Sequence, residues 1–395
     1  PSSQIEVNKV TVTAVNSVTG YGNIIGSGAN PLVNILANVF NFHGAITVNA
    51  NQSNNTTPGS IRIMANELTL PSTSRLEANG VTDGGTITLT ANTTGTINIE
   101  GIIQTNGGNG RGGEINISDA KDIIITNNAI IQSNADNGGS IRIFTNSGDL
   151  IIQNALIQTN GSNGRGGSIG ISATNQTLIQ NSNIESKGLN QGGTILIGND
   201  ADNGTLPFSI YTDIDSSSVI TTNALLNNQN QINPNYVGGF IETSAHTLNL
   251  LGTINAGRGG MWLIDPTNVT INTTAGTSTG TDPISFSNQA NISAAQIQTA
   301  INAGTSVQII ADGTITQTAN LTFAPALGVS VTLTLDNRSG TAQAITLTGT
   351  TTNSGAGELN LNYLASGQIK INGAISATST GKINVIAQSF YATNN

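Results

Sequence analysis

The sequence contains no cysteine, only two histidines and few charged or aromatic side chains, at 8% and 4% of 395 residues. Without cysteine the chain has no disulfide, no thiolate metal ligand and no cysteine nucleophile. With only His43 and His246, a Ser-His-Asp site is poorly supported, because that chemistry depends on a positioned histidine base. We therefore expect that the chain is not an enzyme, binds no cofactor or metal, and obtains its stability from packing.

Basic residues are also scarce. Lys and Arg number 12 against 21 Asp and Glu, so the formal net charge is −9. A nucleic-acid groove needs clustered basic residues to neutralise several phosphates. The tripeptide Arg-Gly-Gly occurs at Arg111, Arg165 and Arg258, but these isolated copies lie at repeat boundaries, where we interpret them as turns. We expect no binding to nucleic acid.

No run of about 20 apolar residues is present, so the sequence predicts no membrane-spanning helix. The sequence starts at Pro1 without a Met or a signal-type segment, and we interpret it as a mature protein or a piece of a longer one. What is abundant instead is Gly, with 47 copies, together with Asn, Thr and Ile. These residues suit tight turns, pleated surfaces and a narrow core.

A Gly-Gly pair recurs at residues 84, 112, 138, 166 and 192, at intervals of 28, 26, 28 and 26. An alternating apolar segment follows each pair, and residues 84–137 align without gaps with residues 138–191. A repeat of this length cannot bury its own apolar face and must stack on its neighbours. The pattern predicts an all-β fold, a parallel β-helix with coils of about 26–28 residues.

Each coil contains three apolar alternations, which predicts three short strands around a triangular core. We expect the Ile and Leu positions of these alternations to point inward, and stacked Asn side chains to form hydrogen-bonded ladders. With a strand spacing of about 4.8 Å, some 15 coils give a rod about 70 Å long. The alternations of one coil are Ile141 with Ile143, Leu150 with Ile152, and Leu156 with Gln158.

The regularity of the repeat divides the chain into three parts. Residues 1–57 are expected to be irregular N-terminal coils or a cap, 58–260 the regular β-helix with an insertion at about 199–237, and 261–395 a C-terminal continuation. A short helical excursion is predicted at 293–303. Apolar residues there have helical spacing, with Ser293 as N-cap and Gly304 as the stop.

The insertion carries the candidate binding residues. Asp213 and Asp215 are two residues apart on a strand-like stretch, which would place both carboxylates on one face about 6–7 Å apart. Paired carboxylates at such distances serve glycosidases, although a solvated acidic patch is the ordinary interpretation of Asp-x-Asp. We therefore name no catalytic residue.

Aromatic residues also gather in or beside the insertion, at Phe208, Tyr211 and Tyr236. Aromatic faces can stack on sugar rings, and a loop on a rigid scaffold is a common place for recognition; packing of these rings against the coil is the alternative. Asp200 and Asp202 could hold an ion in a turn, but a solvated acidic turn explains them as well.

Two segments carry a resemblance to a known family. The stretch Gly259-Gly-Met-Trp-Leu-Ile-Asp-Pro-Thr-Asn-Val-Thr-Ile, followed by Ile292-Ser-Ala-Ala-Gln-Ile-Gln-Thr-Ala-Ile-Asn-Ala-Gly, resembles large exoproteins of Gram-negative bacteria secreted by the two-partner route. These are the filamentous haemagglutinin-like adhesins. The resemblance implies a right-handed parallel β-helix that is secreted to the cell surface through an outer-membrane transporter barrel. The absence of cysteine fits passage of an unfolded chain.

Three functions remain open from the sequence. The first, implied by the resemblance, is a rigid rod or spacer for adhesion, aggregation or biofilm formation, with surface glycans or proteins as partners. The second is a self-assembling extracellular filament or sheath subunit that associates end to end, since open coil ends expose strand edges. The third is a polysaccharide-active enzyme that uses Asp213 and Asp215.

Overall fold

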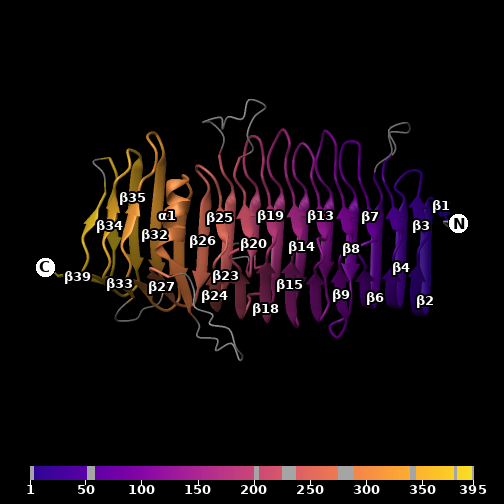
Figure 1. Ribbon diagram of the computed structural model, residues 1–395, viewed down its shortest axis with the longest axis horizontal. Coiled ribbons are helices and arrows are strands. Elements are labelled where there is room, and N and C mark those ends of the chain that lie inside the picture. The colour runs from indigo at the N-terminus through magenta and orange to yellow at the C-terminus, as the bar shows by residue number, and fades with distance from the viewer. Residues whose placement is uncertain are drawn as a thin grey trace.

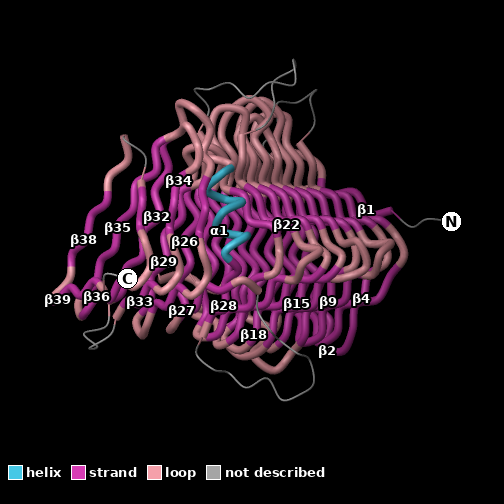
Figure 2. The backbone as a smooth tube through the Cα atoms, turned by 60° about the vertical axis from the view of Figure 1, so that its left-hand side comes forward, coloured by secondary structure: helices cyan, strands magenta, loops and turns pink. Residues whose placement is uncertain are grey.

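The computed structural model describes residues 4–50, 58–199, 204–224, 237–274, 289–338, 344–377 and 380–393. Parallel strands stack along the rod from β1 (Gln4–Val7) near the N-terminal end to β39 (Ser389–Ala392) near the C-terminal end (Figure 1). Figure 2 shows the stacked coils obliquely, with strands on the faces and loops at the corners. The predicted parallel β-helix is confirmed.

Two faces of the rod belong to one 26-stranded sheet, because the long strand β6 pairs with both β8 and β9. The first face contains β2 (Lys9–Gly20), β4 (Leu32–Phe42), β6 (Ser60–Leu70), β8 (Thr86–Thr90), β11 (Glu114–Ser118), β14 (Ser140–Thr145), β17 (Ser168–Ala173), β20 (Thr194–Ile197), β23 (Phe240–Ala245), β26 (Met261–Pro266), β29 (Ser306–Ala311), β32 (Ser330–Asn337), β35 (Glu358–Ala365) and β38 (Ile383–Ile386). The second contains β9 (Thr96–Ile99), β12 (Asp122–Ile125), β15 (Asp149–Gln153), β18 (Gln176–Gln180), β21 (Tyr211–Ile214), β24 (Thr247–Leu250), β27 (Val269–Asn272), β28 (Ala290–Ser293), β30 (Ile315–Gln317), β33 (Ile345–Leu347), β36 (Gln368–Ile371) and β39.

The third face is interrupted by the helix α1 (Ala294–Asn302). Before it lies a 10-stranded sheet of β1, β3 (Asn23–Gly26), β5 (Ala45–Thr47), β7 (Arg75–Glu77), β10 (Ile102–Gln104), β13 (Ile130–Gln132), β16 (Leu156–Gln158), β19 (Asn183–Glu185), β22 (Val219–Thr221) and β25 (Thr253–Asn255). After it lies a 3-stranded sheet of β31 (Leu321–Phe323), β34 (Thr351–Asn353) and β37 (Ile375–Ser376).

The predicted helix is confirmed. Ser293 is the N-cap, and it forms a capping box with Gln296. The two Gln296 side-chain bonds to Leu250 O and Gly252 O, at 2.9 and 3.2 Å, tie the helix to the backbone just before β25. The strand before the helix, β28, lies between β24 and β27 rather than after β27. The coil order is therefore broken here, which a period search alone does not reveal.

The register of the regular coils reproduces the alternating period. Glu114 pairs with Thr86 on one side and with Ser140 on the other. In each of these coils, a hydrogen bond donated by a glycine N–H closes the loop that follows the third strand. Gly113 N–H donates to Thr105 O at 2.7 Å, and Gly139 N–H donates to Ser133 O at 2.8 Å. The second of these loops is shorter than the first by two residues. Loop length at this corner therefore contributes to the change between the 28 and 26 periods, and the other corners change too, because Ile97 pairs with Ile123, 26 residues on, whereas Ile87 pairs with Ile115, 28 residues on.

Isoleucine fills the core, as expected for Ile141, Ile143, Leu150 and Ile152, which are all 0% exposed. The expectation for the third strand is wrong: Ile157 is 0% exposed, whereas Leu156 and Gln158 point outward and are half-buried. In Leu-Ile-Gln only the middle side chain can point inward, because neighbouring residues alternate. Each buried Ile or Leu contributes about 1.5–3 kcal/mol relative to an exposed one.

Polar ladders connect the coils outside the core. Asn181 Nδ2 donates to Asn154 Oδ1 at 2.6 Å, at turns where both residues have positive φ, 44° and 53°. Asparagine tolerates this left-handed conformation better than most residues. A second ladder runs from Gln104 through Gln132 and Gln158 to Glu185, with bonds of 2.9, 2.8 and 2.9 Å. The predicted Asn ladders are confirmed, and glutamine forms one too.

Candidate functional site

The insertion is not a single excursion, because it contains two regular strands. β21 pairs with β18 and β24, and β22 pairs with β19 and β25. Extra residues therefore lie between β20 and β21 and again after β22. Tyr236, Asp200 and Asp202 lie outside the described residues.

Asp213 and Asp215 have different local roles. Asp213 lies on β21, and its Oδ1 accepts a hydrogen bond from Asn249 Nδ2 at 2.5 Å. Asp215 follows the strand and caps a turn. It accepts bonds from the Asn181 N–H at 3.0 Å and from the Ser218 hydroxyl at 2.6 Å. The second carboxylate is thus engaged in ordering the backbone of two coils.

The pKa values of two outward side chains on β21, Asp213 and Tyr211, are raised. Burial raises the pKa of Asp213, the Asn249 hydrogen bond opposes this, and Asp215 adds a further rise by repulsion. Burial, followed by repulsion from Asp213, raises the pKa of Tyr211 to about 12. Tyr211 is therefore a neutral phenol at physiological pH.

The aromatic candidates do not form an open platform. Tyr211 is only 5% exposed, so neither face of its ring is broadly accessible. The half-buried Phe208 ring meets the His246 ring edge-on, with centroids 4.5 Å apart. His246 is exposed, and its Nδ1 lies 3.4 Å from Thr267 Oγ1. Tyr211 therefore packs against the coil, whereas the Phe208 ring is partly packed and partly exposed to solvent.

The segment Gly204–Ser209 crosses the first face of the rod, and we call it the strap. Arg142 on β14 holds it with two hydrogen bonds, from the guanidinium to Thr205 Oγ1 at 3.1 Å and to Thr205 O at 3.0 Å. Leu206 fills the space that Gly170 leaves on β17, where a Cβ would lie 3.1 Å from a Leu206 methyl. A glycine inside a strand often marks such a close approach.

Beneath and beside the strap lies a set of buried hydroxyls. Ser172 Oγ donates to Pro207 O at 2.5 Å, and Ser209 Oγ lies 2.9 Å from Thr177 Oγ1. Glu242, on β23 in the same face, is 1% exposed and accepts a bond from Ser244 Oγ at 2.9 Å. The composition of the insertion does not predict this polar layer, because its members come from several coils.

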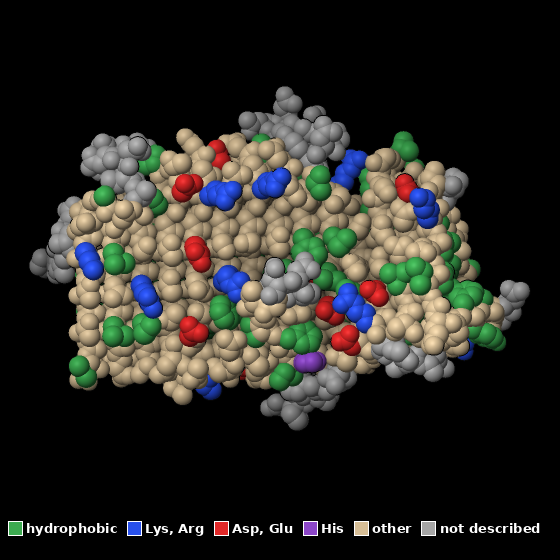
Figure 3. Space-filling model, turned by 180° about the vertical axis from the view of Figure 1, so that it is seen from behind, with side chains coloured by type: hydrophobic (Ala, Val, Ile, Leu, Met, Phe, Trp, Pro, Cys, Tyr) green, Lys and Arg blue, Asp and Glu red, His purple; other side chains and the backbone are tan. Residues whose placement is uncertain are grey.

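A carboxylate cluster occupies the same face further along the rod. Burial, followed by repulsion from Asp312, raises the pKa of Asp265 to about 6, and Arg338 opposes the rise. Arg338 also pairs with Asp336, at 3.6 Å. Figure 3 shows that charged side chains are otherwise sparse on this face. Sequence reasoning missed this cluster because its members are brought together only by the coil register beyond Gly259.

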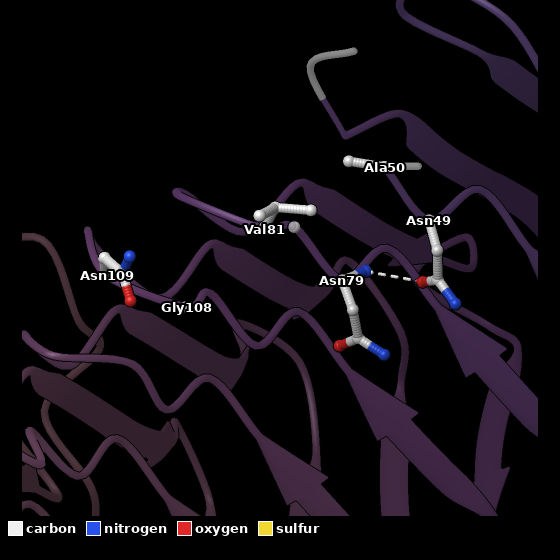
Figure 4. A pocket seen from close by; sticks show the side chains of 7 residues that line it. Asn49, Ala50, Asn79, Val81, Gly108 and Asn109 are labelled. Atoms are coloured by element: carbon white, nitrogen blue, oxygen red, sulfur yellow. Dashed lines mark hydrogen bonds between the residues drawn. The ribbon is translucent and has the colours of Figure 1, made fainter. Parts of the chain in front are cut away.

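A groove of about 500 Å³ lies at the corner that follows the third face (Figure 4). Loops of three successive coils line it, after β5, β7 and β10. A column of stacked asparagines passes along its side: Asn79 N–H donates to Asn49 Oδ1 at 2.7 Å, and Asn106 N–H donates to Asn79 Oδ1 at 2.8 Å. The residues that line it are Asn49, Ala50, Asn79, Gly80, Val81, Gly108 and Asn109.

Neither a metal site nor a membrane helix emerges from the part of the chain that the structure describes. No group of three or more His, Asp or Glu side chains there is placed to hold an ion. No described helix combines the length and apolar character needed to cross a bilayer. Comparison with known proteins gives no match to a family model, to a curated protein or to a solved structure.

Proposed function

We propose that the chain is a segment of a secreted cell-surface adhesin, a rigid rod that holds recognition loops away from the cell. The observation that carries the proposal is the parallel stack that runs from β1 to β39, which is connected outside its core by polar ladders. Such a stack resists bending, because each coil is hydrogen-bonded to the next along its strands.

The resemblance of residues 259–271 and 292–304 to two-partner secretion adhesins supports the same proposal. In the structure, Trp262 of this segment is 0% exposed and donates from Nε1 to Thr243 Oγ1 at 2.9 Å, so the motif stabilises the core. We propose export through an outer-membrane transporter barrel, followed by folding outside the cell. A chain without cysteine can fold there without oxidation.

Display of the chain on a non-adherent bacterium tests this function. Fused to a surface anchor, residues 1–395 are expected to increase retention on epithelial cells, or clumping of the bacteria, several-fold over the anchor alone. The Ile143→Asp variant, displayed at the same level, serves as the unfolded control. Retention and clumping equal to those of the anchor alone would contradict the proposal.

The second candidate, an extracellular filament or sheath subunit, is favoured by one observation. The core positions of the last described coil are open to solvent: Ile383 is 46%, Val385 38% and Phe390 55% exposed. Apolar positions of this kind are covered in any longer stack. Electron microscopy of the purified chain separates the candidates, since filaments of rods joined end to end support the subunit and discrete rods support the adhesin.

A further inference from the structure

The groove of Figure 4 lies among successive loops at the corner that follows the third face. The loop after β7 is closed by a bond from Gly85 N–H to Ala78 O at 2.7 Å. The next loop along the rod is closed in the same way, by a bond from Gly113 N–H to Thr105 O at 2.7 Å. Described residues after three successive strands, β5, β7 and β10, line the groove.

The groove is held open by backbone bonds between coils. Ala50 N–H donates to Asn79 O at 2.8 Å, and Gly108 N–H donates to Thr82 O at 3.0 Å. A side chain at Gly108 would lie 2.0 Å from Val81 O, so glycine is required for the close approach of these two loops. A preformed site loses little conformational entropy when it binds a ligand.

The lining offers amides and one aliphatic side chain. Asn79 uses Oδ1 to accept from Asn106 N–H at 2.8 Å, which leaves its Nδ2 without a partner among the described residues. Asn109 is exposed and makes no side-chain hydrogen bond there. Val81 is 40% exposed beside them. The groove thus offers amide donors and acceptors next to a small apolar surface, and none of its lining residues is ionisable.

We propose that this groove binds a neutral, hydroxyl-rich sugar unit of a surface glycan. Amide groups can both donate to and accept from sugar hydroxyls, while Val81 suits the C–H face of a sugar ring. The net charge of −9 disfavours acidic glycans, and the uncharged lining gives them no compensating partner. This inference rests on the proposed adhesive function and names a ligand class for it.

The repeat supplies a matched control position. Asn109 and Asn163 occupy the same place in Gln104-Thr-Asn-Gly-Gly-Asn-Gly-Arg and Gln158-Thr-Asn-Gly-Ser-Asn-Gly-Arg. Asn163, however, donates from Nδ2 to Asp136 Oδ1 at 2.6 Å. The Asn163 side chain is thus engaged in a hydrogen bond, whereas the Asn109 side chain makes none among the described residues and lines the groove.

Saturation-transfer NMR titration of the folded chain with neutral trisaccharides (maltotriose, cellotriose and mannotriose) tests the proposal, with trigalacturonic acid as the acidic probe. We expect at least one neutral probe to bind more tightly than the acidic one, with an affinity unchanged from about pH 5 to pH 8. Asn109→Ala should weaken binding about five-fold, which is the loss of one hydrogen bond. Asn79→Asp retains the acceptor for Asn106 and should weaken binding by a similar factor, whereas Asn163→Ala should leave it unchanged.

Two results would overturn the groove assignment: no neutral probe binds more tightly than the acidic one, or both groove variants bind as well as the original chain. The display assay keeps the larger proposal separate. If displayed cells adhere while the groove variants make no difference, the groove inference fails and the adhesive function stands. If displayed cells do not adhere, the proposed function itself fails.

Discussion

The coils from β8 to β20 and those from β29 to β39 share one fold but differ in how they are held. In the first stretch the inward side chains are almost all Ile or Leu, and continuous ladders run outside. In the second, Gln317 and Thr351 lie in the core and bond to each other at 3.0 Å, beside the buried Tyr363. The first stretch thus repeats one kind of core and ladder, whereas the core of the second contains individual polar and aromatic side chains.

The difference locates where specific behaviour can arise. Identical coils offer the same surface at every step, so recognition needs a place where the repeat changes. The described interruptions are the groove beside the Ala78–Gly85 loop, the strap over Gly170, and the junction at α1. Each depends on a loop length or an inserted segment rather than on the core.

The largest expected contrast comes from placing a charge at inward positions of both stretches. Ile143→Asp buries a carboxylate at a 0% exposed site, and we expect it to lower the free energy of unfolding by more than about 5 kcal/mol. Phe390→Asp introduces the same charge at an inward position that is 55% exposed, and we expect a change within about 0.5 kcal/mol. Urea unfolding followed by circular dichroism measures both.

Equal destabilisation by the two substitutions would contradict the comparison. It would mean that the last coil is covered in solution, as in a filament. Sedimentation velocity on the same samples shows whether self-association accompanies such a result.

The second prediction concerns the junction between the two stretches. The pKa of Asp265 is raised from 3.8 to about 6, so the folded chain holds this proton more tightly than the unfolded chain does. The free energy of unfolding should therefore rise as pH falls from about 6 to about 4, and this contribution is absent above pH 6. Asp265→Asn should stabilise the chain by about 2 kcal/mol near pH 7.5, after allowance for solvent screening, and should flatten the slope.

Chemical unfolding of both forms at several pH values checks this prediction. Asp336→Asn serves as the control, because its carboxylate pairs with Arg338. A variant of Asp265 that keeps the same slope between pH 4 and 6 would show that another group causes it.

A third prediction tests the ladders. Gln132→Ala removes the bonds that Gln132 accepts from Gln104 and donates to Gln158, and should cost about 1 kcal/mol. Thr334→Ala in the C-terminal stretch removes only the 3.3 Å contact from Asn362, and should cost under about 0.5 kcal/mol. If thermal melting shifts equally for both, the ladder adds nothing beyond an isolated pair.

The smallest effect is expected at the strap. Arg142→Ala removes both bonds to Thr205 at a half-buried site, so global stability should change by less than about 1 kcal/mol. The strap itself should open more often. Limited proteolysis near Gly204–Ser209 should be several-fold faster, while Arg111→Ala should leave the cleavage rate unchanged. No difference between the two variants would show that Leu206 alone holds the strap.

The sequence is sufficient to predict the regular fold because each coil repeats the same signals. The Gly-Gly rhythm and the Ile alternation predict the register, and Ser293 with Gly304 predicts α1. The inward side of the third strand is predicted wrongly, because Leu-Ile-Gln is too short for its pattern to decide which side faces inward.

The candidate site is less predictable, since its members are brought together by loop lengths. Asp213 and Asp215 look like a pair in sequence, yet Asp215 caps a turn that involves Asn181 from the preceding coil. The free Asn109 and the occupied Asn163 are identical in their local motif. One coil earlier, Asn163 has Asp136 as its neighbour and hydrogen-bond acceptor, whereas the corresponding neighbour of Asn109 is Thr82. This difference affects the asparagines only because the coils are stacked.

The most direct test of the central claim, that this rod presents adhesive loops, is retention of beads coated with the purified chain on a layer of epithelial cells under flow. The proposal predicts retention several-fold above that of beads coated with Ile143→Asp chain, and a reduction when a soluble neutral glycan recognised by the groove is added. Retention that is no greater than for the unfolded control would contradict it.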